Sequence, residues 1–199
     1  MTTFLLVRHA ASEFMREVYV GRKLDPPLTQ EGDRNARALA EYLNSEHIDI
    51  AETSPRRRAR QTAEHIVKSR NLELKTEEAL DEIDVGDWGG KSFEALAREP
   101  AWQSWNVARH LHRPPGGEAM LDVQQRIVGH LMEMQRRHPE RVIVIVSHAE
   151  VIRSALLYYL GMPVLAHASI EVSPAAVARL RIDDHGAALT AIDDRATLR

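Results

Sequence analysis

FLLVRH, residues 4–9, and VIVIVSH, residues 142–148, are two apolar runs that each stop at a histidine. Short runs rich in aliphatic and β-branched side chains predict buried β-strands, and we expect the start of a helix after each of them. Open α/β sheets form their ligand crevice at the carboxyl ends of such strands. The sequence therefore predicts that His9 and His148 lie at that crevice.

These two histidines have a plain interpretation and a chemical one. A single histidine after a strand is usually a hydrogen-bonded polar group at the edge of a core. Two such positions, one of them preceded by Arg8, favour the chemical interpretation. An imidazole can act as a nucleophile or carry a proton near neutral pH, and a guanidinium suits an anionic substrate. We therefore expect phosphate chemistry.

The composition narrows the class of protein. The 199 residues suit one domain, and a formal net charge of −3 provides no large positive field for binding nucleic acid. The chain has no cysteine, which excludes disulfides and thiolate catalysis. Neither an export signal nor a membrane-spanning apolar stretch is visible in the sequence. We expect a cytoplasmic protein that contacts no membrane.

Apolar strand-like runs alternate with segments of helical periodicity along the chain, which is typical of an α/β fold. Predicted strands cover residues 4–7, 48–52, 72–74, 142–146, 170–172 with 177–182, and 187–192. Predicted helices cover 28–43 with Thr29 as N-cap, a segment with Ser54 as N-cap and Pro55 as first residue, 93–98, a segment around Trp102 and Trp105, 120–134, and 151–159. We predict a three-layer sandwich, in which helices cover both faces of a mostly parallel central sheet with one antiparallel edge strand.

We expect a single domain over residues 1–199, with residues 83–118 as a cap or lid over the crevice. Several side chains of this region and of the first loop have two interpretations, as contacts to the substrate or as core and solvated surface. These are Phe14, Met15, Trp102 and Trp105 as an apolar wall, and Arg109, His110, His112 and Arg113 as a polar one. The pair His110 and His112 also resembles a fragment of a metal site, but no cysteine and no HExxH helix accompanies it, so we predict no metal.

Phosphoryl transfer sets its own requirements. Positive donors must hold the equatorial oxygens, a nucleophile must stand in line with the leaving oxygen, and an acid must protonate the leaving alkoxide. A neutral imidazole can attack phosphorus and form a phosphohistidine that water then hydrolyses. The loop of residues 80–84 offers carboxyl groups for the acid. From the residues alone, Asp81, Glu82 and Asp84 all remain candidates.

Five motifs in order along residues 4 to about 160 carry a family resemblance. They are LLVRH (5–9) with Gly21-Arg22 and Pro27-Leu28-Thr29, SPRRRARQTA (54–63), Leu80-Asp81-Glu82 with Gly86-Asp87-Trp88, Pro115-Gly116-Gly117-Glu118, and Val146-Ser147-His148. The chain resembles branch 1 of the histidine phosphatase superfamily, the phosphoglycerate-mutase-like proteins. That resemblance implies the same α/β sandwich.

The resemblance also implies roles for individual residues. His9 is the implied phosphorylated nucleophile, Glu82 the implied proton donor and acceptor, and His148 the third catalytic residue. Phosphate contacts are implied for Arg8, Arg58, Ser12, Arg22 and the backbone of Ala149. The family pattern selects Arg58 because it precedes Ala59, and it selects Glu82 from the loop carboxyls.

Three departures from the family pattern affect the expected pocket. Ala10 and Ala149 stand where glycines are usual, and Met15 replaces an asparagine. Ser12 keeps a hydroxyl, and Ala149 keeps a backbone N–H that can meet a phosphate oxygen at a helix N-terminus. The loss of the asparagine makes that side of the pocket more apolar.

Hydrolysis is the favoured reaction. Related mutases have a larger insertion between the acid loop and the Gly-Gly-Glu motif, whereas this chain has only residues 83–115 there, and a shorter lid admits water. We expect a phosphatase acting on a small phosphate monoester, without cofactor or nucleic acid, and a homodimer is left open. The alternatives are mutase-type phosphoryl transfer and a non-catalytic protein that binds a phosphorylated ligand.

Overall fold

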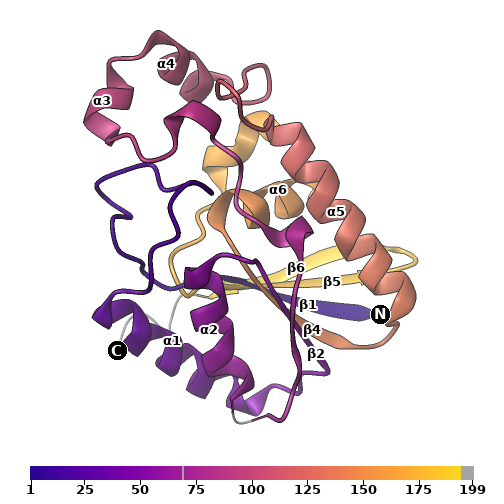
Figure 1. Ribbon diagram of the computed structural model, residues 1–199. Coiled ribbons are helices and arrows are strands. Elements are labelled where there is room, and N and C mark those ends of the chain that lie inside the picture. Colours follow the sequence, from indigo (N-terminus) through magenta and orange to yellow (C-terminus); the bar gives the residue numbers. More distant parts are fainter. Residues whose placement is uncertain (69, 194–199) are drawn as a thin grey trace.

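A computed structural model of the chain describes residues 1–68 and 70–193 (Figure 1). Residue 69 and residues 194–199 of the predicted domain lie outside the described residues. The strands are β1 (Thr2–Arg8), β2 (Ile50–Thr53), β3 (Leu74–Thr76), β4 (Val142–Ser147), β5 (Val177–Asp183) and β6 (Gly186–Asp193). The helices are α1 (Gln30–Tyr42), α2 (Arg57–Val67), α3 (Phe93–Ala97), α4 (Pro100–Val107), α5 (Met120–Arg137) and α6 (Ala149–Tyr159).

The described strands form one six-stranded sheet with the order β3-β2-β4-β1-β5-β6. The four strands from β3 to β1 pair in parallel, whereas β5 pairs antiparallel with β1, and β6 pairs antiparallel with β5. The predicted mostly parallel α/β sheet is confirmed. The strand that runs against the others is β5, one position in from the edge strand β6.

Alternating side chains of the two central strands bury both faces of the sheet. In β1, Phe4 and Leu6 join a core with α5 and α6, while Leu5 and Val7 join a second core with α1 and α2. Figure 1 shows these two helix pairs on opposite sides of the sheet. Burial on both faces explains why β1 and β4 are continuous apolar runs, and it gives the three layers.

Several predicted element boundaries differ from the structure. No helix follows His9, because residues 10–29 form an irregular loop that reaches α1 only after its N-cap Thr29. The second helix begins at Arg57 with Arg56 as N-cap, so the predicted cap at Ser54 is wrong. Residues 170–172 are not a strand. The Ser54 hydroxyl is held by the side chain of His148 at 2.7 Å, and the functional site therefore uses the group that the sequence suggested as a cap.

The segment predicted as a cap carries α3 and α4, which Figure 1 shows beyond one end of the sheet. Aromatic side chains hold it in place. Trp105 is fully buried, and its ring centroid lies 5.6 Å from that of Trp88 and 6.2 Å from that of Tyr19. Trp102 packs against the same rings. These contacts favour core packing over a substrate wall for the two tryptophans, and a lid role for residues 83–118 stays a prediction.

Within residues 1–68 and 70–193, no helix has the length and apolar character needed to cross a bilayer. The cytoplasmic location stays a prediction.

Candidate active site

The two histidines come together because β1 and β4 are neighbours in parallel register. Arg8 pairs with Ser147, so His9 and His148 follow at the same edge of the sheet. Their rings meet edge to face with centroids 5.1 Å apart, and both side chains are buried. The structure thus places both histidines at the carboxyl ends of the two central strands, where the sequence predicted the crevice.

The backbone sets the tautomer of His9. Its Nδ1 lies 2.8 Å from the carbonyl oxygen of Ala10, and a carbonyl can only accept, so we assign the proton to Nδ1 and the lone pair to Nε2. Burial, with the charges of Arg58 and Arg8, holds the pKa of His9 well below its usual range. The imidazole is therefore neutral near pH 7 and carries on Nε2 the lone pair that a nucleophile needs.

Arg58, near the start of α2, lies at the centre of the site. Its side chain is 2% exposed, its Nε donates to His9 Nε2 at 3.3 Å, and its Nη2 lies 3.3 Å from His148 Nδ1. Nη2 also donates to the carbonyl of Gly21 at 3.2 Å. One guanidinium thus contacts both imidazoles, which fixes its position relative to the nucleophile.

Glu82 completes the group from the loop after β3. Its Oε2 lies 3.7 Å from Arg58 Nη2 and 3.4 Å from His148 Nδ1, and its Oε1 accepts from the backbone N–H of Ile83. Burial raises the pKa of Glu82, although Arg58 acts in the opposite direction. A carboxyl group with a raised pKa holds a proton at a higher pH than an exposed one, which suits a general acid.

His148 is oriented from its other ring nitrogen. Its Nε2 lies 2.7 Å from Ser54 Oγ, whose hydroxyl donates to Asp81 Oδ1 at 3.5 Å. Burial and the charge of Arg58 hold the pKa of His148 well below its usual range. A neutral ring that donates from Nε2 turns its Nδ1 toward Arg58 and Glu82.

Two buried guanidinium nitrogens at the site have no hydrogen-bond partner among the described residues. They are Nε of Arg8 and Nη1 of Arg58. The rest of the Arg8 guanidinium is held by the carbonyl of Val172 at 2.7 Å and by the sulfur of Met15 at 3.8 Å. Buried donors without acceptors are costly, so these two nitrogens favour an anion in the site.

A cavity of about 160 Å³ contains these groups and includes the predicted residues Ser12 and Ala149. Its lining also contains Tyr19 and Glu150. Ala149 is the first residue of α6, where backbone N–H groups lack acceptors within the helix. A phosphate in this cavity would therefore meet two guanidinium groups and a helix N-terminus.

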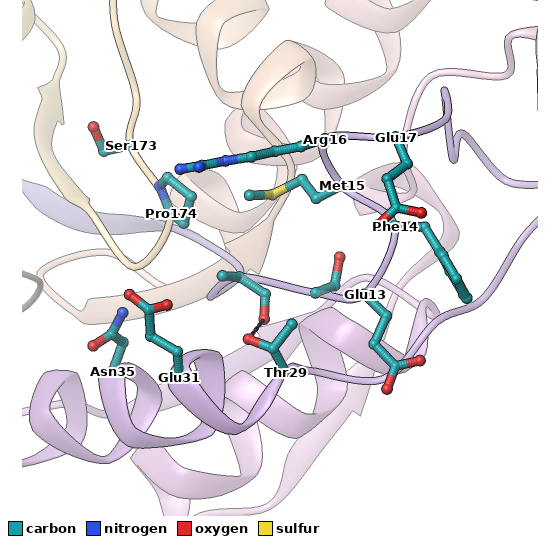
Figure 2. Close-up of a pocket in the computed structure, with 12 residues that line it drawn as sticks. Glu13, Phe14, Met15, Arg16, Glu17, Thr29, Glu31, Asn35, Ser173 and Pro174 are labelled. Carbon is teal, nitrogen blue, oxygen red and sulfur yellow. Dashed lines mark hydrogen bonds between the residues drawn. The ribbon is translucent and has the colours of Figure 1, made fainter. Parts of the chain in front are cut away.

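A larger cavity of about 630 Å³ adjoins the first and shares Ser12 and Met15 with it. Figure 2 shows its walls: Glu31 and Asn35 rise from α1, while Met15 and Arg16 reach across from the loop toward Pro174. None of His9, Arg58, Glu82 and His148 lines it. The chemistry belongs to the smaller cavity, and the larger one offers room for the rest of a substrate.

Arg22 is not brought to either cavity. Its Nε donates to the backbone carbonyl of Glu82 at 2.5 Å, and its guanidinium pairs with Glu118 at 2.8 Å and with Asp81 at 3.3 Å. These contacts hold the loop that carries Glu82. The geometry favours a positioning role for Arg22 over the predicted phosphate contact.

The sequence does not reveal the roles of two polar residues of the site, Ser54 and Glu150. It also does not decide whether Arg109 contacts the substrate or lies on the solvated surface. The sequence predicts Ser54 as a helix cap, and it gives no role to Glu150, although this residue follows the strand end at His148. Arg109 pairs with Glu150 at 2.9 Å and covers the ring of Trp105 at 3.8 Å.

In the described part of the chain, no group of three or more His, Asp or Glu side chains is arranged to hold a metal ion.

The chain is similar to several known proteins. The sequence profile of the histidine phosphatase superfamily (branch 1) matches residues 4–195. Phosphoserine phosphatase 1 of Hydrogenobacter thermophilus is 34% identical over 164 residues, 81% of this chain and 78% of that protein. A 2,3-bisphosphoglycerate-dependent phosphoglycerate mutase of Brucella melitensis is 30% identical over 175 residues, 80% of this chain and 82% of the mutase. The solved structure of Bacillus stearothermophilus YhfR superposes with a TM-score of 0.90 at 28% identity and covers 96% of each chain.

Proposed function

The chain belongs to branch 1 of the histidine phosphatase superfamily, and on that premise we propose that it hydrolyses phosphate monoesters through a phosphohistidine formed on His9. Phosphatase activity is supported by relatives named as phosphatases, among them that of H. thermophilus and PhoE of Bacillus subtilis. The finer assignment, a phosphoric monoester hydrolase resembling the histidine acid phosphatases, is part of the proposal. One observation carries it: a neutral buried His9 presents Nε2 beside guanidinium nitrogens that have no partner.

The first step transfers the phosphoryl group to the enzyme. His9 Nε2 attacks phosphorus while Arg8, Arg58 and the start of α6 hold the phosphoryl oxygens. The bond between phosphorus and the ester oxygen breaks, and Glu82 gives its proton to the departing oxygen, which leaves as an alcohol. The enzyme then carries an N–P bond on His9 and a carboxylate at Glu82.

The second step releases phosphate. Water attacks phosphorus, the Glu82 carboxylate takes a proton from that water, and the N–P bond breaks. Inorganic phosphate leaves, His9 returns to its neutral form with Nε2 free, and Glu82 is again protonated. The set of residues is restored without a metal or an organic cofactor.

The experiment is steady-state hydrolysis of p-nitrophenyl phosphate in EDTA between about pH 5 and pH 8, where imidazoles titrate. We expect turnover that resists the chelator, and a His9→Ala variant that loses it by at least about a thousandfold, as nucleophile removal does elsewhere. His47→Ala, which removes an exposed histidine paired with Asp49, is the control and is expected to keep full activity. A rapid acid quench of the wild type should trap an acid-labile phosphoenzyme that the His9→Ala variant lacks.

Three results would contradict the proposal, and each leads to a different function. Turnover retained by His9→Ala would exclude His9 as the nucleophile. Mutase activity on 3-phosphoglycerate without hydrolysis would indicate phosphoryl transfer, as in the mutase relative. Stabilisation by inorganic phosphate in thermal unfolding without any turnover would indicate a protein that only binds phosphorylated ligands.

A further inference from the structure

Glu150, the second residue of α6, lines the same cavity as His9, yet the proposed chemistry gives it no task. Its Oε1 accepts hydrogen bonds from Arg109 at 2.9 Å and from Arg153 at 3.2 Å. Its Oε2 is buried and has no hydrogen-bond partner among the described residues, since His167 Nε2 lies 3.6 Å away, beyond hydrogen-bond distance. The site therefore contains a carboxylate oxygen in need of a donor.

The phosphate group cannot supply that donor. A phosphate dianion satisfies the unpaired nitrogens of Arg8 and Arg58, but a carboxylate repels it. Burial acts to raise the pKa of Glu150, but Arg109, Arg153 and His167 outweigh it and hold the pKa below its usual range, so Glu150 is ionised near pH 7. The other half of the substrate can supply the missing donor.

We propose that Glu150 is a specificity-determining residue whose carboxylate accepts a hydrogen bond from a protonated amine on the leaving group of the ester. The substrate class is then an aminoalkyl phosphate monoester, and acidic leaving groups are disfavoured. This inference rests on the proposed phosphatase function and adds the leaving group to it.

The walls of the adjoining cavity support the same charge preference. Three carboxylates, from Glu13, Glu17 and Glu31, line it together with one guanidinium, from Arg16. Figure 2 shows Glu31 on α1 facing the segment that carries Met15 and Arg16. A leaving group that extends from the smaller cavity past Met15 enters a region in which negative side chains outnumber positive ones, and this favours a cation.

The opposite preference has its own physical argument. Arg109 and Arg153 could attract a substrate carboxylate, because both stand beside Glu150. Neither of them lines the cavity, and Glu150 already occupies one nitrogen of each. The carboxylate of Glu150 therefore stands between these two cations and the substrate.

The test compares kcat/KM for three phosphate monoesters of similar chain length: 2-aminoethyl phosphate, propyl phosphate and carboxymethyl phosphate. We expect the wild type to prefer the amine over the propyl ester by about tenfold or more, as for a charge-assisted hydrogen bond, and to disfavour the carboxylate. Glu150→Gln should lower the amine-to-propyl ratio by about tenfold. Glu150→Asp keeps the charge and should retain part of the preference.

Glu133→Gln is the matched control, because Glu133 pairs with Arg136 on the exposed side of α5, and its amine-to-propyl ratio should equal that of the wild type. Equal rates for all three esters in the wild type, or a preference for the carboxylate, would overturn the inference and leave the phosphatase function standing. A ratio unchanged in a folded Glu150→Gln variant would overturn it as well. If none of the esters nor p-nitrophenyl phosphate is hydrolysed, the proposed function itself fails.

Discussion

The chemistry of Glu82 depends on its surroundings, because burial raises the pKa of its carboxyl group while Arg58 lies 3.7 Å away. An alkoxide needs a proton as it leaves, whereas an aryl oxide needs little help. We predict that Glu82→Gln lowers kcat/KM for an alkyl phosphate by about 10²- to 10⁴-fold, and for p-nitrophenyl phosphate by much less. Steady-state assays of both esters measure the two losses.

The dependence of the hydrolysis rate on pH gives a second test of the role of Glu82. The acid form of Glu82 is lost as the pH rises through its raised pKa, so the wild-type rate with an alkyl phosphate falls over that range. The rate of Glu82→Gln should not show this fall. The substrate itself ionises with a second pKa of about 6, and this affects both proteins alike. Glu94→Gln changes an exposed residue of α3 and is the control: its rate should fall with rising pH as the wild-type rate does. Equal losses for both esters would mean that Glu82 does not protonate the leaving group.

At the scale of single residues, strand patterns predicted His9 and His148, because an apolar run fixes where a strand ends. Spacing could not choose among the arginines of residues 56–60, since a charged run on a helix reads as solvated surface. The structure separates them by their partners. Arg56 pairs with Asp81 at 2.8 Å, whereas Arg58 is buried against both histidines. Such a choice depends on contacts with residues far away in the sequence, and only the family pattern supplied it.

At the scale of elements, the start of α1 is fitted closely to the loop that carries Ser12. The carbonyl of Ala11 accepts from the N–H of Thr29 at 3.0 Å, and a Cβ added to Gly32 would meet that oxygen at 1.9 Å. We predict that Gly32→Ala pushes α1 and the loop apart, lowers the free energy of unfolding by roughly 1–3 kcal/mol, and lowers kcat/KM. Urea unfolding and p-nitrophenyl phosphate assays measure the two effects.

Gly129 provides the matched control. It lies in the middle of α5, and nothing stands within 4 Å of an added Cβ. Gly129→Ala should therefore raise the free energy of unfolding by roughly 0.5–1 kcal/mol, because alanine loses less backbone entropy in a helix. If Gly32→Ala proved as stable as the wild type, the close fit of α1 to the loop would be refuted.

Helices with a clear apolar stripe were predicted well, as α5 and α6 show, because their periodicity alone determines which face is buried. The start of α2 was predicted two residues early, since Ser54 and Pro55 form a good local cap signal. Rules that use only neighbouring residues cannot predict that the Ser54 hydroxyl binds His148, which is far away in the sequence. The residue pattern likewise indicated two final strands, but the place of β5 beside β1 follows from packing across the whole sheet.

At the scale of the whole molecule, two buried neutral histidines make stability depend on pH. Burial, the first cause for both, holds the pKa of His9 and of His148 well below 6.5, so the unfolded chain binds these protons first. The contribution of the two histidines to the free energy of unfolding is therefore fully present above about pH 6.5. It is lost as the pH falls from there toward the lowered pKa values. Each histidine contributes a slope of up to about 1.4 kcal/mol per pH unit in that window.

Urea unfolding at several pH values between about pH 5 and pH 7.5 measures this slope. His9→Ala should remove roughly half of the contribution of the two histidines, while the opposite contribution of Glu82, whose pKa is raised, remains in both proteins. Gly129→Ala, which changes no titratable group, should keep the wild-type slope. A His9→Ala slope equal to that of the wild type would show that folding does not lower the pKa of His9.

The position of β1 has a consequence for biosynthesis. This strand leaves the ribosome before the other strands of the sheet, yet its two neighbours are β4 and β5, the second of which ends at Asp183. The nascent chain must therefore carry an apolar strand without its partners until β4 and β5 have been made, a state that favours chaperone binding and aggregation. His9 contacts His148 and Arg58 only once β1 has its partner strands. The capacity to hydrolyse a substrate therefore arises together with the finished fold.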